Sequence, residues 1–292
     1  MRNVKLLNYL HLHFIVFIWG FTAVLGALIS IDAIPLVWHR MSLGAIFILG
    51  YMLLKRDKLK VSIKSLLKFC FVGFLIAMHW FAFFYAIKVS NVSITLAMMS
   101  TGAFFASLLE PIIFKRKIVS YEVIFGLVVM VGLYIIFRVE SEYLTGILFA
   151  LFASFLGALF AILNGILVKT HNASVITFYE MVFGVLCISI YLLFTDGFSY
   201  SFFILSANDW IYLLILASIC TAYAFIASIH VMKWISPYTV MLTTNMEPVY
   251  GIILALLILG DKEYMSGSFY LGAIIILLTV IANGIIKTRI KE

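Results

Sequence analysis

The sequence predicts an all-α integral membrane protein with ten transmembrane helices, arranged as two five-helix inverted-topology repeats around a central cavity. The composition is the first reason, because 65% of the 292 residues are hydrophobic and 11% are charged, whereas soluble domains are about 45–50% apolar and about 25% charged. The second reason is a series of ten apolar runs, each long enough to cross a hydrocarbon layer of about 30 Å as a helix. The third is an internal repeat of five such runs.

Each predicted helix corresponds to one continuous apolar run. The runs lack polar alternation and are about twice as long as a membrane strand, so they predict helices and exclude a β-barrel. The first run follows a basic start but is too long for the apolar region of a cleaved signal, which indicates an uncleaved first helix. In chain order the runs are 10–29, 35–54, 66–87, 91–114, 120–137, 144–168, 174–194, 210–233, 237–259 and 267–286.

The basic residues predict how the chain is oriented. With a cytoplasmic N-terminus, 16 of the 20 lysines and arginines fall in the termini and connections on the cytoplasmic side, and the other four are Arg40, Lys88, Arg138 and Lys262. Because inward-facing connections carry an excess of basic residues, both termini are expected in the cytoplasm, with the chain in the bacterial inner membrane. The charges are scattered over short connections, so no nucleic-acid partner is expected.

The second half of the chain repeats the features of the first at a shift of about 140–146 positions. Thr101 stands 25 residues before Gly126, and Glu247 stands 25 residues before Gly272. A unit with an odd number of crossings inserts its second copy upside down, so the copies are expected to be related by a two-fold axis in the membrane plane. The predicted units of five helices are 1–140 and 141–292.

Motifs for catalysis, metal binding and nucleotide binding are missing from the sequence. There is no phosphate-binding Gly-x-x-x-x-Gly-Lys-Ser/Thr loop, no His-Glu-x-x-His zinc helix and no Gly-x-Ser-x-Gly nucleophile turn. Cys70, Cys187 and Cys220 lie inside apolar runs without paired spacing, which predicts core residues, not a disulfide framework or a zinc site. The chain is therefore expected to be no enzyme and to need no cofactor or metal.

Three stretches carry a resemblance to a known family. They are "FIWGFTAVLG" in the first run, "HRMSLGA" in the second, and "EPVYGIILALLILGDKEYMSGSFYLG" from Glu247 onward. With ten runs in two inverted copies, the chain resembles the EamA family of the drug/metabolite transporter superfamily. Asp261 stands where the family usually has Glu, and the first half departs from the pattern with Gly102 where Pro248 aligns. The resemblance implies a ten-helix secondary transporter that exports amino acids and related metabolites.

The most informative residue is Glu247, which stands next to Pro248 near the middle of the ninth apolar run. Proline has no N–H, so the carbonyl of Thr244 loses its helical partner and a polar notch is expected. Thr243 lies beside them on the same helix face. An acid at this depth costs on the order of 3 kcal/mol, so we expect it in a cavity, where it binds substrate or couples transport to protons. The alternative is a protonated side chain that hydrogen-bonds a neighbouring helix.

The same local unit recurs at Glu110 and Pro111 near the cytoplasmic end of the fourth run, where Pro111 predicts a second helix break. The repeat alignment places Glu110 nine positions past the counterpart of Glu247, so the two acids are not equivalent. Glu110 is close in sequence to Lys115 and Arg116, which favours a gate or a structural ion pair over a substrate role.

Arg40 is a basic residue inside the second apolar run, away from the connections that carry most of the basic charge. Its side chain could extend to the outer interface, or its planar guanidinium could pair with Glu247 or with a substrate carboxylate. The aligned position in the second half is Glu180, an opposite charge near the inner side that is expected to form a structural latch.

Several polar or aromatic side chains lie at mid-run depth and are candidates for lining the cavity. In the third run His79 offers a titratable ring and Trp80 a stacking surface. For each candidate the alternative is a purely structural role, in which the side chain holds helices together. The remaining candidates are Trp19, Ser100, Thr101, Asn164 and Tyr223.

Together these features predict a secondary transporter, an exporter or facilitator, that moves small metabolites such as amino acids by alternating access. Its partners would be the small-molecule substrate and membrane lipid, with the proton as a candidate coupling ion, and it would act as a monomer or homodimer. Two alternatives stay open. A flippase for a lipid or lipid-linked sugar would need a side opening to the bilayer, and a lipid-modifying membrane enzyme would cluster its polar residues at one interface.

Overall fold

The computed structural model describes residues 2–115 and 120–290, apart from the side chains of residues 2–5, 120–123, 139, 283–284 and 287–290. In these ranges every regular element is helical, which confirms the all-α prediction. The α-helices are α1 Arg2–Leu28, α2 Ala33–Lys55, α3 Ile63–Val89, α4 Val92–Met99, α5 Gly102–Phe114, α6 Ser120–Val139, α7 Leu144–Leu167, α8 Ala173–Phe194, α9 Tyr200–Phe203, α10 Ala207–Ala217, α11 Ala224–Val231, α12 Pro237–Thr244, α13 Glu247–Leu259 and α14 Gly267–Ile290. The π-helical turn η2 covers Ser218–Tyr223, and the 3₁₀ turns η1 and η3 cover Ser141–Tyr143 and Gly260–Glu263.

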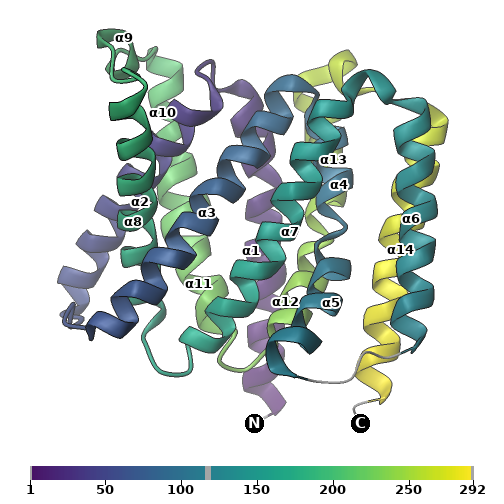
Figure 1. Ribbon diagram of the computed structural model, residues 1–292, viewed down its shortest axis with the longest axis horizontal. Coiled ribbons are helices and arrows are strands. Elements are labelled where there is room, and N and C mark those ends of the chain that lie inside the picture. Colours follow the sequence, from purple (N-terminus) through teal and green to yellow (C-terminus); the bar gives the residue numbers. More distant parts are fainter. Residues whose placement is uncertain (1, 116–119, 291–292) are drawn as a thin grey trace.

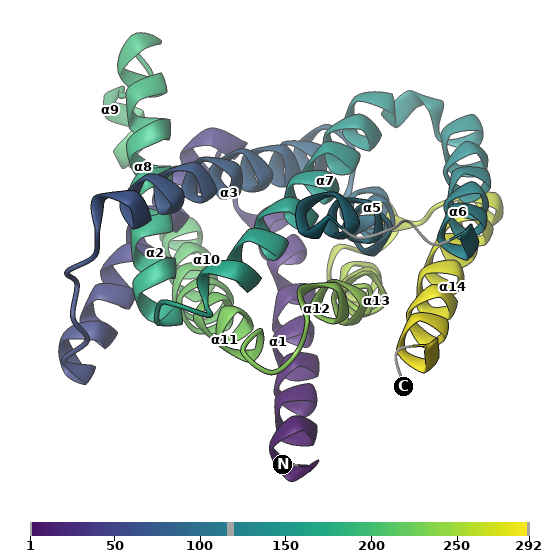
Figure 2. The same cartoon turned by 60° about the horizontal axis from the view of Figure 1, so that its bottom comes forward.

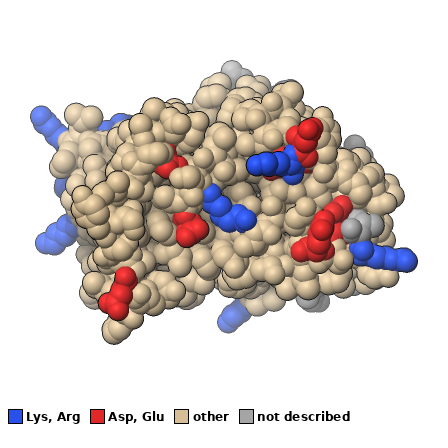
Figure 3. Space-filling model, turned by 90° about the horizontal axis from the view of Figure 1, so that it is seen from above, with Lys and Arg blue, Asp and Glu red and all other residues tan. Residues whose placement is uncertain are grey.

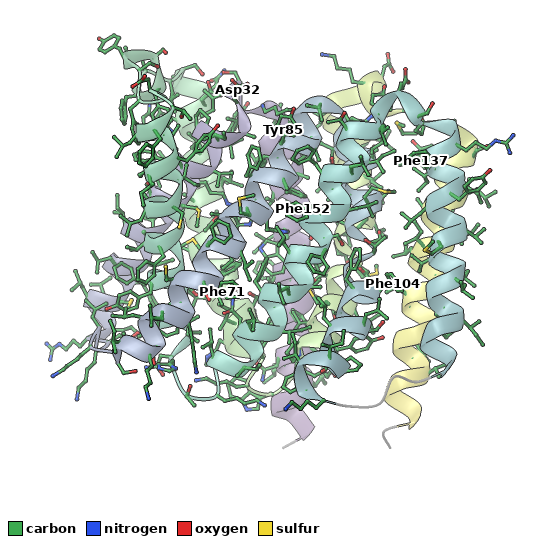
Figure 4. The ribbon with its side chains drawn as sticks, in the orientation of Figure 1. Asp32, Phe71, Tyr85, Phe104, Phe137 and Phe152 are labelled. Carbon is green, nitrogen blue, oxygen red and sulfur yellow. The ribbon has the colours of Figure 1, made fainter. Side chains whose placement is uncertain are left out.

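The helices run between the two ends of one bundle (Figure 1). Below, the end at which α1 starts and α14 stops is called the terminal end, and the opposite end is called the far end. Asp32 and Tyr85 lie toward the far end, whereas Phe71 lies nearer the terminal end (Figure 4). Large apolar side chains such as Phe71, Phe137 and Phe152 are exposed on the surface of the bundle, as expected for positions that contact lipid.

The helices have the length and composition of membrane spans. Eight segments of the described ranges are long and apolar enough to cross a membrane. Two more apolar stretches, Ile124–Arg138 in α6 and Gly267–Ala282 in α14, are shorter. The protein is thus an all-helical multi-pass membrane protein, and ten crossings stay a prediction.

Three of the predicted helices are interrupted. The fourth run is divided between α4 and α5, and the ninth between α12 and α13. The breaks fall at Ser100–Thr101 and Asn245–Met246, which are 145 positions apart in the sequence. The eighth run contains the π-helical turn η2 between α10 and α11. Interruption of a membrane helix frees backbone polar groups, which have to be satisfied by protein or by a cavity.

The predicted break at Pro111 is wrong. Pro111 lies inside α5, which continues to Phe114, and the break in this run lies instead at Ser100–Thr101, where no proline is present. Neighbouring hydroxyls can satisfy the backbone around a proline in a membrane helix. Pro111 removes the helical partner of the Ser107 carbonyl, while the buried Ser107 hydroxyl donates to the carbonyl of Phe104 at 2.8 Å.

Helices from the two halves of the chain lie against each other throughout the bundle. The neighbouring pairs include α1 with α13, α3 with α7, α2 with α8, and α6 with α14 (Figures 1 and 2). The first long helix after residue 140 is α7, and it ends at the terminal end, where α1 begins (Figure 1). The two halves therefore traverse the bundle in opposite directions. The pair of α6 and α14 forms one edge of the bundle.

Two carboxylates tie segments together at the far end. Asp209, at the start of α10, accepts hydrogen bonds from the backbone N–H and the hydroxyl of Ser30, at 2.6 and 2.7 Å. Glu263 in η3 accepts from the N–H of Val92 at 3.1 Å and from the N–H and hydroxyl of Ser93 at 2.8 and 2.9 Å. Acidic and basic side chains lie in small mixed groups on this face (Figure 3). The far end is thus held by contacts between connections that are distant in sequence.

Candidate functional site

A cavity of about 740 Å³, its open mouth included, lies among α1, α2, α3, α4, α7, α11, α12 and α13. Its walls therefore come from both halves of the chain. The residues predicted from the sequence that line this cavity are Trp19, Arg40, His79, Trp80, Asn164, Thr244 and Glu247. We call it the central cavity.

Glu247 reaches the central cavity beside the break in the ninth predicted helix. Helix α12 ends at Thr244, and Pro248 lies in the first turn of α13, where the missing proline N–H costs no helical hydrogen bond. The hydroxyl of Thr244 donates to the carbonyl of Val240 at 2.9 Å. The Glu247 side chain is 8% exposed and lines the cavity, so its carboxyl group is withdrawn from both lipid and bulk water.

Arg40 is a second charged group on the same cavity. Its side chain is 2% exposed, so the alternative in which it extends to the membrane interface is wrong. The guanidinium Nε donates to the hydroxyl of Thr221 at 2.7 Å, and Cζ lies 3.9 Å from the centroid of the Trp80 ring. Arg40 and Glu247 both line this cavity. The cavity thus holds a buried cation and a buried acid.

His79 is fixed against α7 by one hydrogen bond. Its Nδ1 lies 2.7 Å from the carbonyl oxygen of Ala153, and because a carbonyl only accepts, Nδ1 carries the proton. A Cβ atom at Gly157 would lie 3.3 Å from the His79 ring, so the small residue leaves room for the imidazole. The ring edge of Phe160 packs on the same imidazole at a centroid distance of 5.1 Å.

The π-helical turn η2 supplies partners for two cavity residues. Trp19 Nε1 donates to the carbonyl of Cys220 at 3.3 Å. The hydroxyl of Thr221, which accepts from Arg40, donates to the carbonyl of Leu216 at 2.8 Å, five residues earlier. Irregular turns inside helices commonly place backbone groups at functional sites. Cys220 is buried and unbridged, as predicted, and its backbone carbonyl holds the Trp19 ring.

Three predicted hydroxyl residues are buried outside the cavity lining. Ser100 donates to the carbonyl of Leu96 at 3.4 Å, and Thr243 donates to the carbonyl of Thr239 at 2.9 Å. Thr101 donates to the carbonyl of Met98 at 2.7 Å and lies 3.0 Å from the hydroxyl of Ser154 in α7. These contacts fit the structural alternative, in which hydroxyls hold broken or neighbouring helices.

Tyr223 also lies outside the cavity, contrary to expectation. Its side chain is 44% exposed, and its hydroxyl is 2.9 Å from Nε2 of His11 in α1. The prediction rested on depth in the run alone, which does not determine the direction of a side chain, and the π-helical turn that ends at Tyr223 changes the rotation of this residue relative to α11. The residues of α11 that do face the cavity are Phe225, Ser228, Ile229 and, just after the helix, Met232.

The two remaining predicted acids lie in different surroundings. Glu180 in α8 is fully buried, and its Oε2 lies 3.4 Å from Nδ2 of Asn164, a residue of the central cavity. This amide is the observed hydrogen-bond partner of Glu180, and the role of Glu180 as a structural latch stays a prediction. Glu110 in α5 is 5% exposed and lines a second cavity at the terminal end, together with Lys169 and Lys233. Of its predicted partners, Arg116 lies outside the described residues.

Sequence reasoning missed several residues of the central cavity. Thr22 follows Trp19 by three positions, which places the two on one face of α1. Phe160 precedes Asn164 by four positions on α7. The same helical spacing, applied to each predicted residue, would have found both. Among the described residues no group of three or more His, Cys, Asp or Glu side chains could hold a metal ion.

Known proteins resemble this chain in sequence and in fold. The chain is 25% identical over 207 residues to an uncharacterized transporter of Clostridium kluyveri, an alignment that covers 68% of this chain and spans 65% of the length of that curated relative. A crystal structure of another protein superposes with a TM-score of 0.68, covering 95% of this chain and 97% of that one at 14% identity, which shows a shared fold. The EamA-like transporter family matches residues 8–138 and, a second time, residues 144–284. The chain therefore belongs to the EamA-like transporter family.

Proposed function

We propose that the protein is a secondary transporter of the bacterial inner membrane, an exporter or facilitator that moves small metabolites, amino acids foremost, by alternating access. The observation that carries the proposal is the pair of buried opposite charges, Arg40 on α2 and Glu247 on α13, in one cavity. Buried charges require compensation by partners of opposite sign. A zwitterionic substrate supplies both complementary groups at once.

Polar atoms around the central cavity indicate how such a substrate would bind. Among the described residues, Arg40 Nη1 and the Thr22 hydroxyl have no hydrogen-bond partner, and both groups can donate to a carboxylate. Asn164 Oδ1 likewise has no hydrogen-bond partner among the described residues. This oxygen and the Glu247 carboxylate would accept hydrogen bonds from an ammonium group. The aromatic wall that would receive an apolar side chain consists of Trp19, Trp80, Phe160 and Phe225.

Two features support alternating access. The broken helices meet in the bundle, since α4 lies against α13 and α5 against α12. They also interrupt the chain at positions 145 residues apart, in halves that traverse the bundle in opposite directions. We assign residues 1–140 and 141–292 to two inverted repeats that rock about the central cavity. The terminal end would face the cytoplasm, as the distribution of basic residues predicts.

Glu247 is the residue proposed to couple transport to protons. It lines the cavity beside the helix break and faces the positive charge of Arg40. A substrate ammonium group would stabilise the ionised carboxyl group, whereas an unoccupied cavity would favour its protonated form. Binding of substrate from one side and of a proton from the other would then link the two fluxes.

The test is transport of labelled leucine, phenylalanine and threonine into proteoliposomes that contain the purified protein. We expect saturable uptake of at least one amino acid, and a rise in the apparent melting temperature of the purified protein with the same compound, because a ligand that binds the folded state stabilises it. Absence of both effects for a full set of amino acids would refute the proposed substrate class. Movement of labelled lipid in the same vesicles, without amino-acid flux, would favour the flippase alternative.

A further inference from the structure

The second cavity lies at the terminal end of the bundle and measures about 660 Å³, open solvent included. Its lining comes from the ends of α5, α7 and α11 and from the connection that leads into α12. The charged residues in it are Glu110, Lys169 and Lys233, and Trp234 contributes an aromatic ring. We call this cavity the vestibule.

Met232 joins the vestibule to the central cavity, because its side chain lines both. Met232 is 8% exposed and lies directly after α11. An unbranched thioether side chain changes rotamer easily, so it can open or close a passage without movement of the backbone. Gly165 and Pro237, which also line the vestibule, are in close contact, since a Cβ atom on Gly165 would lie 2.1 Å from Cγ of Pro237. Met232 is thus the flexible side chain between the two cavities.

Hydrogen bonds tie distant connections together at the far end of the bundle. There Glu263 joins η3 to the start of α4 through hydrogen bonds from Val92 and Ser93. The structure thus combines a tied far end with a solvent-open vestibule at the terminal end. A small molecule would approach the central cavity from the vestibule side in this arrangement.

The accessible charge in the vestibule is positive. Lys169 and Lys233 are both exposed, whereas Glu110 on the same lining is 5% exposed. The two lysines come from the chain just after α7 and just after α11, so two separate segments present ammonium groups to one hollow. Trp234 is 45% exposed and offers an apolar ring face beside the charges. This combination suits a small amphipathic molecule with a carboxylate.

We propose that the vestibule is a separate binding site for a carboxylate-bearing small molecule, which Lys169 and Lys233 hold before it passes Met232 into the central cavity. As a step toward transport, the inference rests on the proposed function. As a binding site, it can be tested without any transport.

The test uses cysteine labelling in inside-out membrane vesicles, which expose the terminal end if it is cytoplasmic. Cys70, Cys187 and Cys220 are first replaced by alanine. Ser236→Cys then places a thiol on the exposed vestibule wall, and Met232→Cys places one between the two cavities. Two methanethiosulfonate reagents of similar size serve as probes, one with a sulfonate and one with a quaternary ammonium group.

The measured quantity is the labelling rate with the anionic reagent divided by the rate with the cationic reagent. We expect this ratio to be about tenfold higher for Ser236→Cys than for a free thiol in solution, because clustered positive charge concentrates anions locally. Lys169→Gln with Lys233→Gln should abolish this preference, and high salt should reduce it. Lys64→Gln with Lys68→Gln is the matched control, since these lysines lie near the start of α3, outside the vestibule lining. If both double variants lose the preference for the anionic reagent to the same extent, the assignment of Lys169 and Lys233 to the binding site is overturned.

Benzoate and benzylammonium test the carboxylate preference directly. Benzoate should slow labelling of Ser236→Cys and do so less in the Lys169→Gln, Lys233→Gln variant, whereas benzylammonium should give little protection. Met232→Cys should be labelled by reagents added on the vestibule side. If neither reagent labels it, the proposed passage past Met232 is overturned. Equal protection by the two compounds would overturn the carboxylate site. If benzoate protects but no amino acid is transported, the vestibule stands and the proposed function fails.

Discussion

The guanidinium carbon of Arg40 lies 3.9 Å from the centroid of the Trp80 ring, and Arg40 Nε donates to the Thr221 hydroxyl at 2.7 Å. These contacts fix a buried cation on the wall of the central cavity. A desolvated cation over an indole ring is stabilised by about 2 kcal/mol. They also leave Nη1 with no hydrogen-bond partner among the described residues, in a lining that faces the cavity. Arg40 is therefore held in place with one buried donor unsatisfied, and we propose that a ligand carboxylate supplies its partner.

Arg40→Lys is expected to weaken amino-acid binding about tenfold or more, because a hydrogen bond to a charged group contributes about 1.5–3 kcal/mol and lysine lacks the planar set of donors that a guanidinium offers to Thr221 and a carboxylate. Equilibrium binding of the labelled amino acid to purified protein measures the effect. Arg56→Lys, at the exposed end of α2, is the control and should bind as the wild type does. Unchanged affinity in Arg40→Lys would remove Arg40 from the substrate site.

Glu247→Gln is expected to make transport independent of pH. In the wild-type protein the rate should fall in acid, because a carboxyl group that must release its proton in every cycle then stays protonated. Glutamine has nearly the same shape and cannot ionise, so the variant should show a flat and lower rate. Proteoliposome uptake across a pH series measures this. Glu142→Gln, on an exposed residue in η1, should keep the wild-type profile. A wild-type profile in Glu247→Gln would exclude the coupling role.

Glu263→Gln is expected to loosen the far end. The amide group of glutamine would face the N–H donors of Val92 and Ser93, and removal of hydrogen bonds to a buried carboxylate costs about 1–3 kcal/mol. Thermal unfolding in detergent should show a lower midpoint, while Asp261→Asn, on an exposed residue of the same turn, should show little change. Equal unfolding midpoints for the two variants would show that the hydrogen bonds of Glu263 to Val92 and Ser93 do not stabilise the far end.

Gly165→Ala is expected to destabilise the protein by about 1–3 kcal/mol through overpacking. Its new methyl group would lie 2.1 Å from Cγ of Pro237, so α7 and α12 would have to separate. Gly50→Ala is the matched control in α2, where a Cβ atom would meet nothing within 4 Å and the gain in helix propensity is about 1 kcal/mol. Thermal unfolding of both variants measures the difference. Equal midpoints would show that α7 and α12 are free to move apart.

The positions of the helices could be predicted because the length of an apolar run is itself the requirement for crossing a membrane. The position of Glu247 was predictable for a related reason: a carboxyl group at mid-span is too costly to leave in lipid, and it does line the central cavity. The adjacent break followed from the missing N–H of Pro248.

The remaining features depend on contacts between segments that are distant in sequence. The break at Ser100–Thr101 contains no proline, and a hydrogen bond of Thr101 with Ser154 in α7 is part of what holds it. Tyr223 was misplaced because a π-helical turn leaves no clear mark in an apolar sequence, yet it rotates the residues on either side. The vestibule joins the ends of helices from both halves, which only the folded bundle brings together.

The two helix breaks differ in how they are made. A proline ring shapes the one before α13, and that covalent constraint persists through every conformation of the protein. Hydroxyl contacts from Thr101 hold the one before α5, and they can be broken and remade. In the proposed alternating access we therefore expect the break before α13 to stay stiff and the break before α5 to take up most of the bending.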